Sequence, residues 1–370
     1  MSPRWPIALA CALASLCLGV MSATIASAPY GHRVSALVHM SPADGVSTLA
    51  RASDPGFALV PPGSHYDGSY FYAIARDPLA IGRAHGLIDE APYRYGHAGL
   101  GLLAYLVALG RAPAIPLALL TINLLALAAA AWCASRLATG LGRTGWAGLL
   151  VAASPGLLYA VANDTSEPLS AALLGAGLLA WQRGRPLLAA LAFLPMCLTK
   201  EPLVLVPVAI GLWHAVSLLR ARQLSRAAVR QLGSLAVGPV VFAGWVFYLQ
   251  NRFGASPIDH GQGRLTRPLH GFLDSLRLAA QMVNGDTNAS QLAGIAMPLL
   301  LATAGALLVG CVVALRLRTV IDLAYLASAG LALCLSFFAL LYPKDLIRTT
   351  VIPMLLLPAV LATRRSVPPA

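Results

Sequence analysis

Apolar residues recur in long runs along this chain, and polar residues gather in short stretches between the runs. A helix needs about 20 mostly apolar residues to cross a bilayer, and about ten runs approach that length. Their approximate ranges are 5–28, 114–135, 145–162, 169–182, 186–199, 203–219, 233–250, 292–315, 320–341 and 347–362. The pattern predicts an all-α polytopic membrane protein, with residues 1–370 forming a single transmembrane domain.

Two of the polar stretches between the apolar runs are long, and both are expected on the outer side of the membrane. The first covers residues 29–113 and the second residues 251–291. Within the first, residues 98–110 (AGLGLLAYLVALG) are apolar but too few to cross. They predict a helix lying at the outer interface. Counting them as a span would place Arg136, Arg143, Arg183 and Arg185 outside, which the positive-inside rule disfavours.

The first run has a second interpretation as a cleavable signal peptide. Ala26-Ser27-Ala28 resembles the small-residue pattern that signal peptidase recognises. However, Pro29 follows directly, and the run is long enough to cross the bilayer. The sequence therefore favours an uncleaved membrane anchor, with the N-terminus in the cytoplasm.

Composition supports the membrane assignment. Of the 370 residues, 58% are hydrophobic and 11% are charged, whereas soluble domains carry about 25% charged residues. The net charge of +12 would suggest nucleic acid in a soluble protein, but here the arginines follow the positive-inside rule and meet membrane lipids. We expect no nucleic-acid partner and a cytoplasmic C-terminus. The inner arginines are Arg4, Arg136, Arg143, Arg183, Arg185, Arg220, Arg222, Arg226, Arg230, Arg316, Arg318, Arg364 and Arg365.

The acidic residues are distributed the opposite way. The chain has 14 Asp and Glu residues, and in this threading only Asp322 lies on the inner side. A site built from carboxylates must therefore open outward. The heavy use of Ala, Leu and Arg is typical of a bacterium, so the expected location is the bacterial inner membrane with the site facing the periplasm. The six cysteines lie within apolar runs and indicate neither a disulfide framework nor a zinc site.

Residues 65–78 of the first connection (HYDGSYFYAIARDP) carry the most informative pattern. Asp67 stands at the start of an expected short helix, where a carboxylate can cap free backbone N–H groups. Pro78 ends that helix. One helix side carries Tyr66, Tyr70, Ala73 and Asp77. From spacing alone, Asp67 is either a helix cap beside an interfacial aromatic belt or a functional carboxylate.

The run Tyr66-Asp67-Gly68, followed by Tyr70-Phe71-Tyr72 and Ile74-Ala75, resembles the first-loop signature of the GT-C superfamily of integral-membrane glycosyltransferases. The superfamily includes protein-O-mannosylating enzymes and aminoarabinose transferases of lipid A. The layout over about the first 220 residues is also similar. Residues 163–168 (NDTSEP) and 198–202 (LTKEP) stand where such enzymes often place polar residues at the outer edge of the membrane.

The resemblance implies an enzyme that moves a sugar from a polyprenyl-phosphate carrier to an acceptor on the outer face, with inversion at the anomeric carbon. Asp67 is then the candidate base for the acceptor hydroxyl. The leaving group is a lipid phosphate, so outward-facing cations should stabilise its developing charge. Those cations are Arg94, Lys200, Lys344 and Arg348, whereas the candidates for orienting substrates are Tyr66, Tyr70, Asp77 and Glu167. Lys344 and Arg348, four residues apart, could face one phosphate or simply snorkel at a helix end.

The sequence departs from the family in one respect. Many members carry a paired acidic motif that is often tied to a metal, but Gly68 and Ser69 follow Asp67 here. Asp77 or the Asp89-Glu90 pair could supply a second carboxylate. We predict neither a metal nor another cofactor.

Other polar residues give weaker signals. Asp164 and Glu167 could share a helical face, with Glu167 orienting the acceptor, or could merely cap the next helix, where Pro168 suits the first turn. The isolated histidines His97, His260 and His270 are expected to be solvated surface residues.

Two other functions remain open. A transporter or flippase would carry ionisable residues deep in its spans, whereas here the polar groups collect at one face. A non-catalytic scaffold for envelope-polysaccharide assembly is the third interpretation, because the paired acidic motif is missing. The sequence does not identify the sugar or the acceptor, which could be protein, lipid or glycan.

Overall fold

The computed structural model describes residues 4–222, 225–260, 264–283 and 287–362. These residues form α-helices and short 3-10 helices, and no β-strand occurs among them. The expected all-α fold is therefore confirmed for the described part of the chain. Residues 363–370, which include Arg364 and Arg365, lie outside it.

Within the part of the chain that the structure describes, five helical segments are long and apolar enough to cross a membrane, which indicates a membrane protein. They include all or most of α1 (Arg4–Ser27), α6 (Ile115–Gly140), α11 (Leu205–Ala221), α12 (Arg226–Phe253) and α15 (Thr287–Ala314). Many of their large apolar side chains are exposed, including Leu9, Leu125 and Leu212. Such side chains suit contact with lipid tails rather than water.

A sixth crossing is formed only if a bent pair is counted as one span. η5 (Gly145–Gly148) and α7 (Leu149–Ala152) are followed by α8 (Pro155–Ala162), with a bend of 48° between them. Pro155 lacks an N–H group and cannot continue the preceding helix. Ser154 instead begins α8 as its N-cap, where its side chain accepts a hydrogen bond from the Leu157 N–H.

The other apolar runs form shorter helices than the ten-span expectation requires. The run 320–341 is broken, and the run expected at 347–362 begins later. The resulting helices are α9 (Glu167–Gln182), α10 (Pro186–Thr199), α16 (Val320–Leu333), α17 (Phe337–Leu340), α18 (Pro343–Thr349) and α19 (Val351–Ala362). The break after α16 has a tertiary cause, because backbone groups of residues 264–269 bond to those of residues 333–336.

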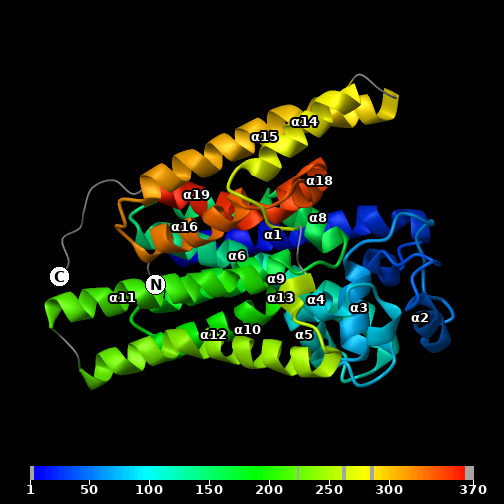
Figure 1. Cartoon of the computed structure of the whole chain (residues 1–370), viewed down its shortest axis with the longest axis horizontal. Coiled ribbons are helices and arrows are strands. Elements are labelled where there is room, and N and C mark those ends of the chain that lie inside the picture. The colour runs from blue at the N-terminus through cyan, green and yellow to red at the C-terminus, as the bar shows by residue number, and fades with distance from the viewer. Residues whose placement is uncertain (1–3, 223–224, 261–263, 284–286, 363–370) are drawn as a thin grey trace.

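The first long connection folds into a compact cap at one end of the bundle (Figure 1). Its α-helices are α2 (Ser47–Ser53), α3 (Gly68–Arg76), α4 (Ala91–Gly96) and α5 (Gly99–Val107), and its 3-10 helices are η1 (Ala28–Tyr30), η2 (Val34–Val38), η3 (Ala84–Leu87) and η4 (Ala112–Ala114). The short apolar helix expected at 98–110 is present as α5. It packs on α3, α6 and α10.

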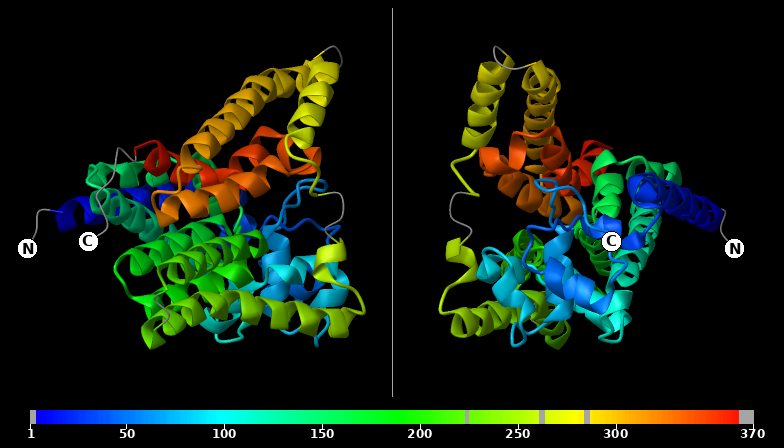
Figure 2. Two further views of the ribbon diagram at one scale, coloured as in Figure 1. Left: turned by 60° about the vertical axis from the view of Figure 1, so that its left-hand side comes forward. Right: turned by 90° about the vertical axis from the view of Figure 1, so that its right-hand side faces the viewer.

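The second long connection is more helical than expected. It contains the end of α12, α13 (Pro257–His260) and α14 (His270–Val283), and η6 (Glu201–Val204) lies earlier, between α10 and α11. α14 and α15 form an antiparallel pair that projects from the rest of the bundle in both views of Figure 2. α1 packs on α6 and α8, so the first apolar run is part of the core.

Candidate functional site

A cavity of about 380 Å³ lies where the cap meets the ends of α9, α10 and α18. One wall is polar and includes Asp67, Arg94, Glu167, Lys200 and Arg348. Another part of the lining is apolar, with Leu331, Leu335, Phe338, Ile352 and Pro353 contributed by α16, α17, α19 and the residues directly after α16. Residues more than 280 positions apart in the sequence therefore face one space.

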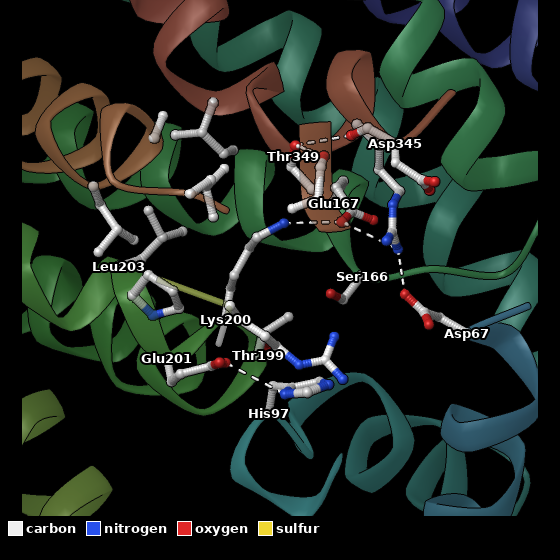
Figure 3. A pocket seen from close by; sticks show the side chains of 18 of the residues that line it. Asp67, His97, Ser166, Glu167, Thr199, Lys200, Glu201, Leu203, Asp345 and Thr349 are labelled. Carbon is white, nitrogen blue, oxygen red and sulfur yellow. Dashed lines mark hydrogen bonds and ion pairs between the residues drawn. The ribbon is translucent and has the colours of Figure 1, made fainter. Parts of the chain in front are cut away.

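The charged groups of the polar wall form a chain of alternating sign (Figure 3). Lys200 Nζ donates a hydrogen bond to Glu167 Oε1 at 2.8 Å. Arg348 Nη1 lies 3.8 Å from that oxygen and donates to Asp67 Oδ2 at 2.5 Å. Arg94 continues the chain, with Nη1 3.5 Å from Asp67 Oδ1 and Nε 3.4 Å from Asp89 Oδ1.

Local sequence explains how these side chains are presented. Asp67 is the N-cap residue of α3, but its side chain makes no capping bond and turns toward the two arginines instead. Glu167 is the first residue of α9 and is followed by Pro168, which suits a first turn. Lys200 is the C-cap of α10 and has an extended conformation. η6 begins directly after it, with Pro202 in its first turn.

Two glycines allow the cap to approach the bundle. A Cβ on Gly68 would lie 2.6 Å from the Asn163 carbonyl oxygen and 2.7 Å from that of Val38. A Cβ on Gly99 would lie 2.3 Å from Thr199 Oγ1. Gly68 thus brings Asp67 toward the loop before Glu167, and Gly99 brings α5 against the end of α10, next to Lys200.

These ion pairs keep the carboxylates of Asp67 and Glu167 ionised. Burial by itself raises the pKa of Asp67, but the Arg348 and Arg94 guanidiniums outweigh it and hold this pKa well below its usual range. Burial likewise raises the pKa of Glu167, and the Lys200 and Arg348 charges outweigh it and lower the pKa to about 2. Asp67 is half-buried, whereas Glu167 is almost completely buried.

The two tyrosines that the sequence singled out lie beside this chain. The Tyr70 ring stacks under Arg94, with the guanidinium carbon 3.7 Å from the ring centre. Tyr66 donates a hydrogen bond to Asp345, and its ring faces Arg348 at 4.9 Å. Both tyrosines line the cavity.

Two of the expected site residues do not line the cavity. Asp77 is buried and accepts hydrogen bonds from the Ile81 and Gly82 backbone N–H groups, and it pairs with His85 at 2.7 Å. Its role is to fold the turn after α3. Lys344 is exposed, with Nζ 4.7 Å from the centre of the Tyr66 ring, and unlike Arg348 it does not line the cavity. Asp89 and Glu90 also lie outside the lining, where Glu90 pairs with Arg264.

Several cavity residues were missed by sequence reasoning. His97 was expected to be solvated, but it is half-buried, lines the cavity and places Nδ1 3.4 Å from Glu201 Oε2. Its ring packs edge-on against Phe71 and Tyr93. Arg264 also lines the cavity, with its guanidinium 4.3 Å from the Tyr93 ring centre. The sequence offered one signal for this part of the cavity, the charged dipeptide Lys200-Glu201. In the structure Lys200 bonds to Glu167, and Glu201 lies beside His97.

Asp164 differs from its expected position as well. It lies before α9 with a φ of 47° and is fully buried, so it does not share a helical face with Glu167. Among the residues that the structure describes, neither carboxylate oxygen of Asp164 has a hydrogen-bond partner at bonding distance. Burial raises the pKa of Asp164 well above its usual range, although the Asn123 side chain opposes this shift.

Among the described residues, no three His, Cys, Asp or Glu side chains gather closely enough to hold a metal ion. Comparison of the chain with known protein families, curated proteins and solved structures finds no match in any of the three.

Proposed function

We propose that the chain is a membrane glycosyltransferase that moves a sugar from a polyprenyl-phosphate carrier to an acceptor at the outer face of the membrane. The observation that carries the proposal is the cavity with one charged and one apolar wall. Lys200, Arg348 and Arg94 are suited to a phosphate, and the apolar wall suits the first units of a lipid tail. The first-loop resemblance to GT-C enzymes points to the same chemistry.

In this mechanism the acceptor oxygen attacks the anomeric carbon as the bond from that carbon to the phosphate oxygen breaks. The electron pair leaves with the phosphate, and the cations stabilise its charge. The acceptor proton passes to Asp67. A carboxylate held by two arginines is a weak base, so donor binding must draw Arg348 toward the phosphate. This exchange raises the basicity of Asp67 only when the donor is in place.

Residues 98–107, which form α5 with its N-cap, lie at the outer interface in this proposal. We further propose the ten-span threading, in which the shorter helices α9, α10, α16 and α19 also cross, both termini are cytoplasmic and the site faces the periplasm of a bacterial inner membrane. Cysteine-accessibility labelling from each side of the membrane tests the threading. A Ser64→Cys probe should react from outside and an Arg220→Cys probe only from inside; the reverse pattern would overturn the orientation.

The activity is tested with purified protein in lipid nanodiscs, radiolabelled polyprenyl-phosphate sugars and a membrane extract as the source of acceptor. Wild-type protein should transfer label from at least one donor, and Asp67→Asn should not. Asp54→Asn is the matched control, because Asp54 lies in the same cap but outside the cavity. Full activity of Asp67→Asn would refute its role as base. Absence of transfer by intact wild-type protein from every donor would favour a transporter or a scaffold.

A further inference from the structure

A second cavity of about 270 Å³ lies between α6, α7, α9 and α19. Its walls are almost entirely apolar. Small residues create the space, since Ala130, Ala134 and Ala138 recur every four residues on one face of α6, and Ala171 and Gly175 do so on α9. We call this cavity the apolar groove.

An empty groove of this kind is unfavourable. Empty apolar space destabilises a fold in proportion to its volume. Water gains little there, because a buried water needs two to four polar partners. An apolar occupant therefore suits the groove better than solvent does.

The groove opens at the surface that the bundle presents to lipid. Leu150 and Pro358 line it and are exposed, whereas Ala130, Leu174 and Leu356 line it and are buried. Leu150 belongs to the bent helix pair that is long and apolar enough to form a sixth membrane span. A lipid tail in the bilayer can thus enter from the side.

One end of the groove is polar and basic. Arg143 and Thr144 are exposed lining residues that follow α6. α6 starts beside the cap and has 26 residues, which corresponds to a length of about 39 Å. Arg143 therefore lies at the end of the bundle opposite the candidate site. Ile321, at the start of α16, also lines the groove, and Arg316 and Arg318 precede it closely in the sequence.

We propose that the apolar groove binds one acyl chain of an anionic phospholipid, with the lipid phosphate at Arg143. The positive charge at the Arg143 end of the groove complements an anionic headgroup, and the apolar walls complement the acyl chain. The site is distinct from the candidate active site, although Ile352 lines both cavities. The proposal does not depend on glycosyltransferase activity.

The test uses the full-length protein, delipidated in detergent, with native mass spectrometry and thermal unfolding in the presence of added lipid. Phosphatidylglycerol should bind at least tenfold more tightly than phosphatidylcholine, and any stabilisation by inorganic phosphate should be the same in wild-type protein and in Arg143→Gln. Ala134→Leu and Ala138→Leu fill the groove and should each weaken phosphatidylglycerol binding at least fivefold. Ala129→Leu is the matched control, because Ala129 is exposed on α6 and does not line the groove.

A second pair of variants tests whether Arg143 binds the lipid headgroup. Arg143→Gln should remove the preference for phosphatidylglycerol, whereas Arg220→Gln, an exposed arginine on α11, should keep it. Unchanged lipid binding by both groove-filling variants would overturn the groove as the site. Equal binding of the two lipids by wild-type protein would overturn the headgroup assignment, and stabilisation by inorganic phosphate that is lost in Arg143→Gln would indicate a site for a free anion instead.

Discussion

The Arg348 guanidinium lies between Asp67 and Glu167 and bridges two carboxylates that are 100 positions apart in the sequence. Its Nη1 donates to Asp67 at 2.5 Å and lies 3.8 Å from Glu167. This one side chain therefore ties the cap to the end of α9. It is also the cation whose position would change most when a phosphate enters.

Arg348→Ala should weaken the use of donor more than the use of acceptor. We expect the KM for donor to rise at least tenfold, because a bidentate phosphate partner is lost. Stability should also fall by about 3 kcal/mol, since the buried Glu167 loses the Arg348 charge and keeps Lys200 as its cationic neighbour. Steady-state kinetics and thermal unfolding measure the two effects, with Arg277→Ala on the exposed side of α14 as control. An equal loss for donor and acceptor would show that Arg348 only supports the fold.

Two lysines with the same expected role should behave differently. Lys200 lines the cavity and bonds to Glu167, whereas Lys344 is exposed and outside the lining. Lys200→Met should reduce donor affinity at least tenfold, and Lys344→Met should change it less than twofold. Donor-binding isotherms on the two purified variants decide the matter. A larger effect at Lys344 would mean that the phosphate binds outside the cavity, next to Lys344.

Acid should weaken the fold through Glu167. Its pKa is lowered from 4.5 to about 2 in the folded protein, so the folded state binds the proton less tightly than the unfolded state does. The resulting stabilisation is complete above about pH 4.5 and is lost as the pH falls toward about 2. Thermal unfolding followed across this range should show a decline that is shallower in Glu167→Gln. An identical decline in the variant would contradict the assignment.

Gly68→Ala should damage the site although it adds only a methyl group. The new Cβ would meet two backbone oxygens, which cannot rotate away. We expect a cost of about 1–3 kcal/mol and a loss of transfer activity, because α3 must shift with Asp67 at its start. Gly86→Ala is the control, since nothing lies within 4 Å of its Cβ and it belongs to the same cap. Equal melting temperatures and activities for the two variants would show that the close approach is unimportant.

Asp164→Asn should stabilise the protein at neutral pH. The pKa of Asp164 is raised in the folded state, so folding favours the protonated form. Stability of the wild type should therefore decrease as the pH rises above the ordinary pKa of 3.8 toward the folded value. The neutral amide avoids this loss, and the gap in melting temperature between variant and wild type should widen from pH 4 to pH 8. A constant gap would indicate that Asp164 has a partner in solution.

The sequence alone determined the class of fold, the presence of membrane-spanning helices and the start of the helix that bears Asp67. These properties follow from local patterns, since backbone polar groups in lipid must bond within the protein, which favours helix in a long apolar run. It also singled out Asp67, Arg94, Glu167, Lys200 and Arg348, because placing the polar residues on one side of the membrane restricts which of them can meet.

Only the tertiary structure decided which of those residues share a cavity. Asp77 and Tyr70 belong to the same helical pattern, yet the turn after α3 draws Asp77 into its own backbone bonds. His97 carries no local signal, and it becomes a cavity residue because η6 places Glu201 beside it. The break after α16 likewise depends on backbone bonds from residues 264–269. Each of these outcomes depends on contacts between distant segments, and the period of a sequence pattern carries no information about such contacts.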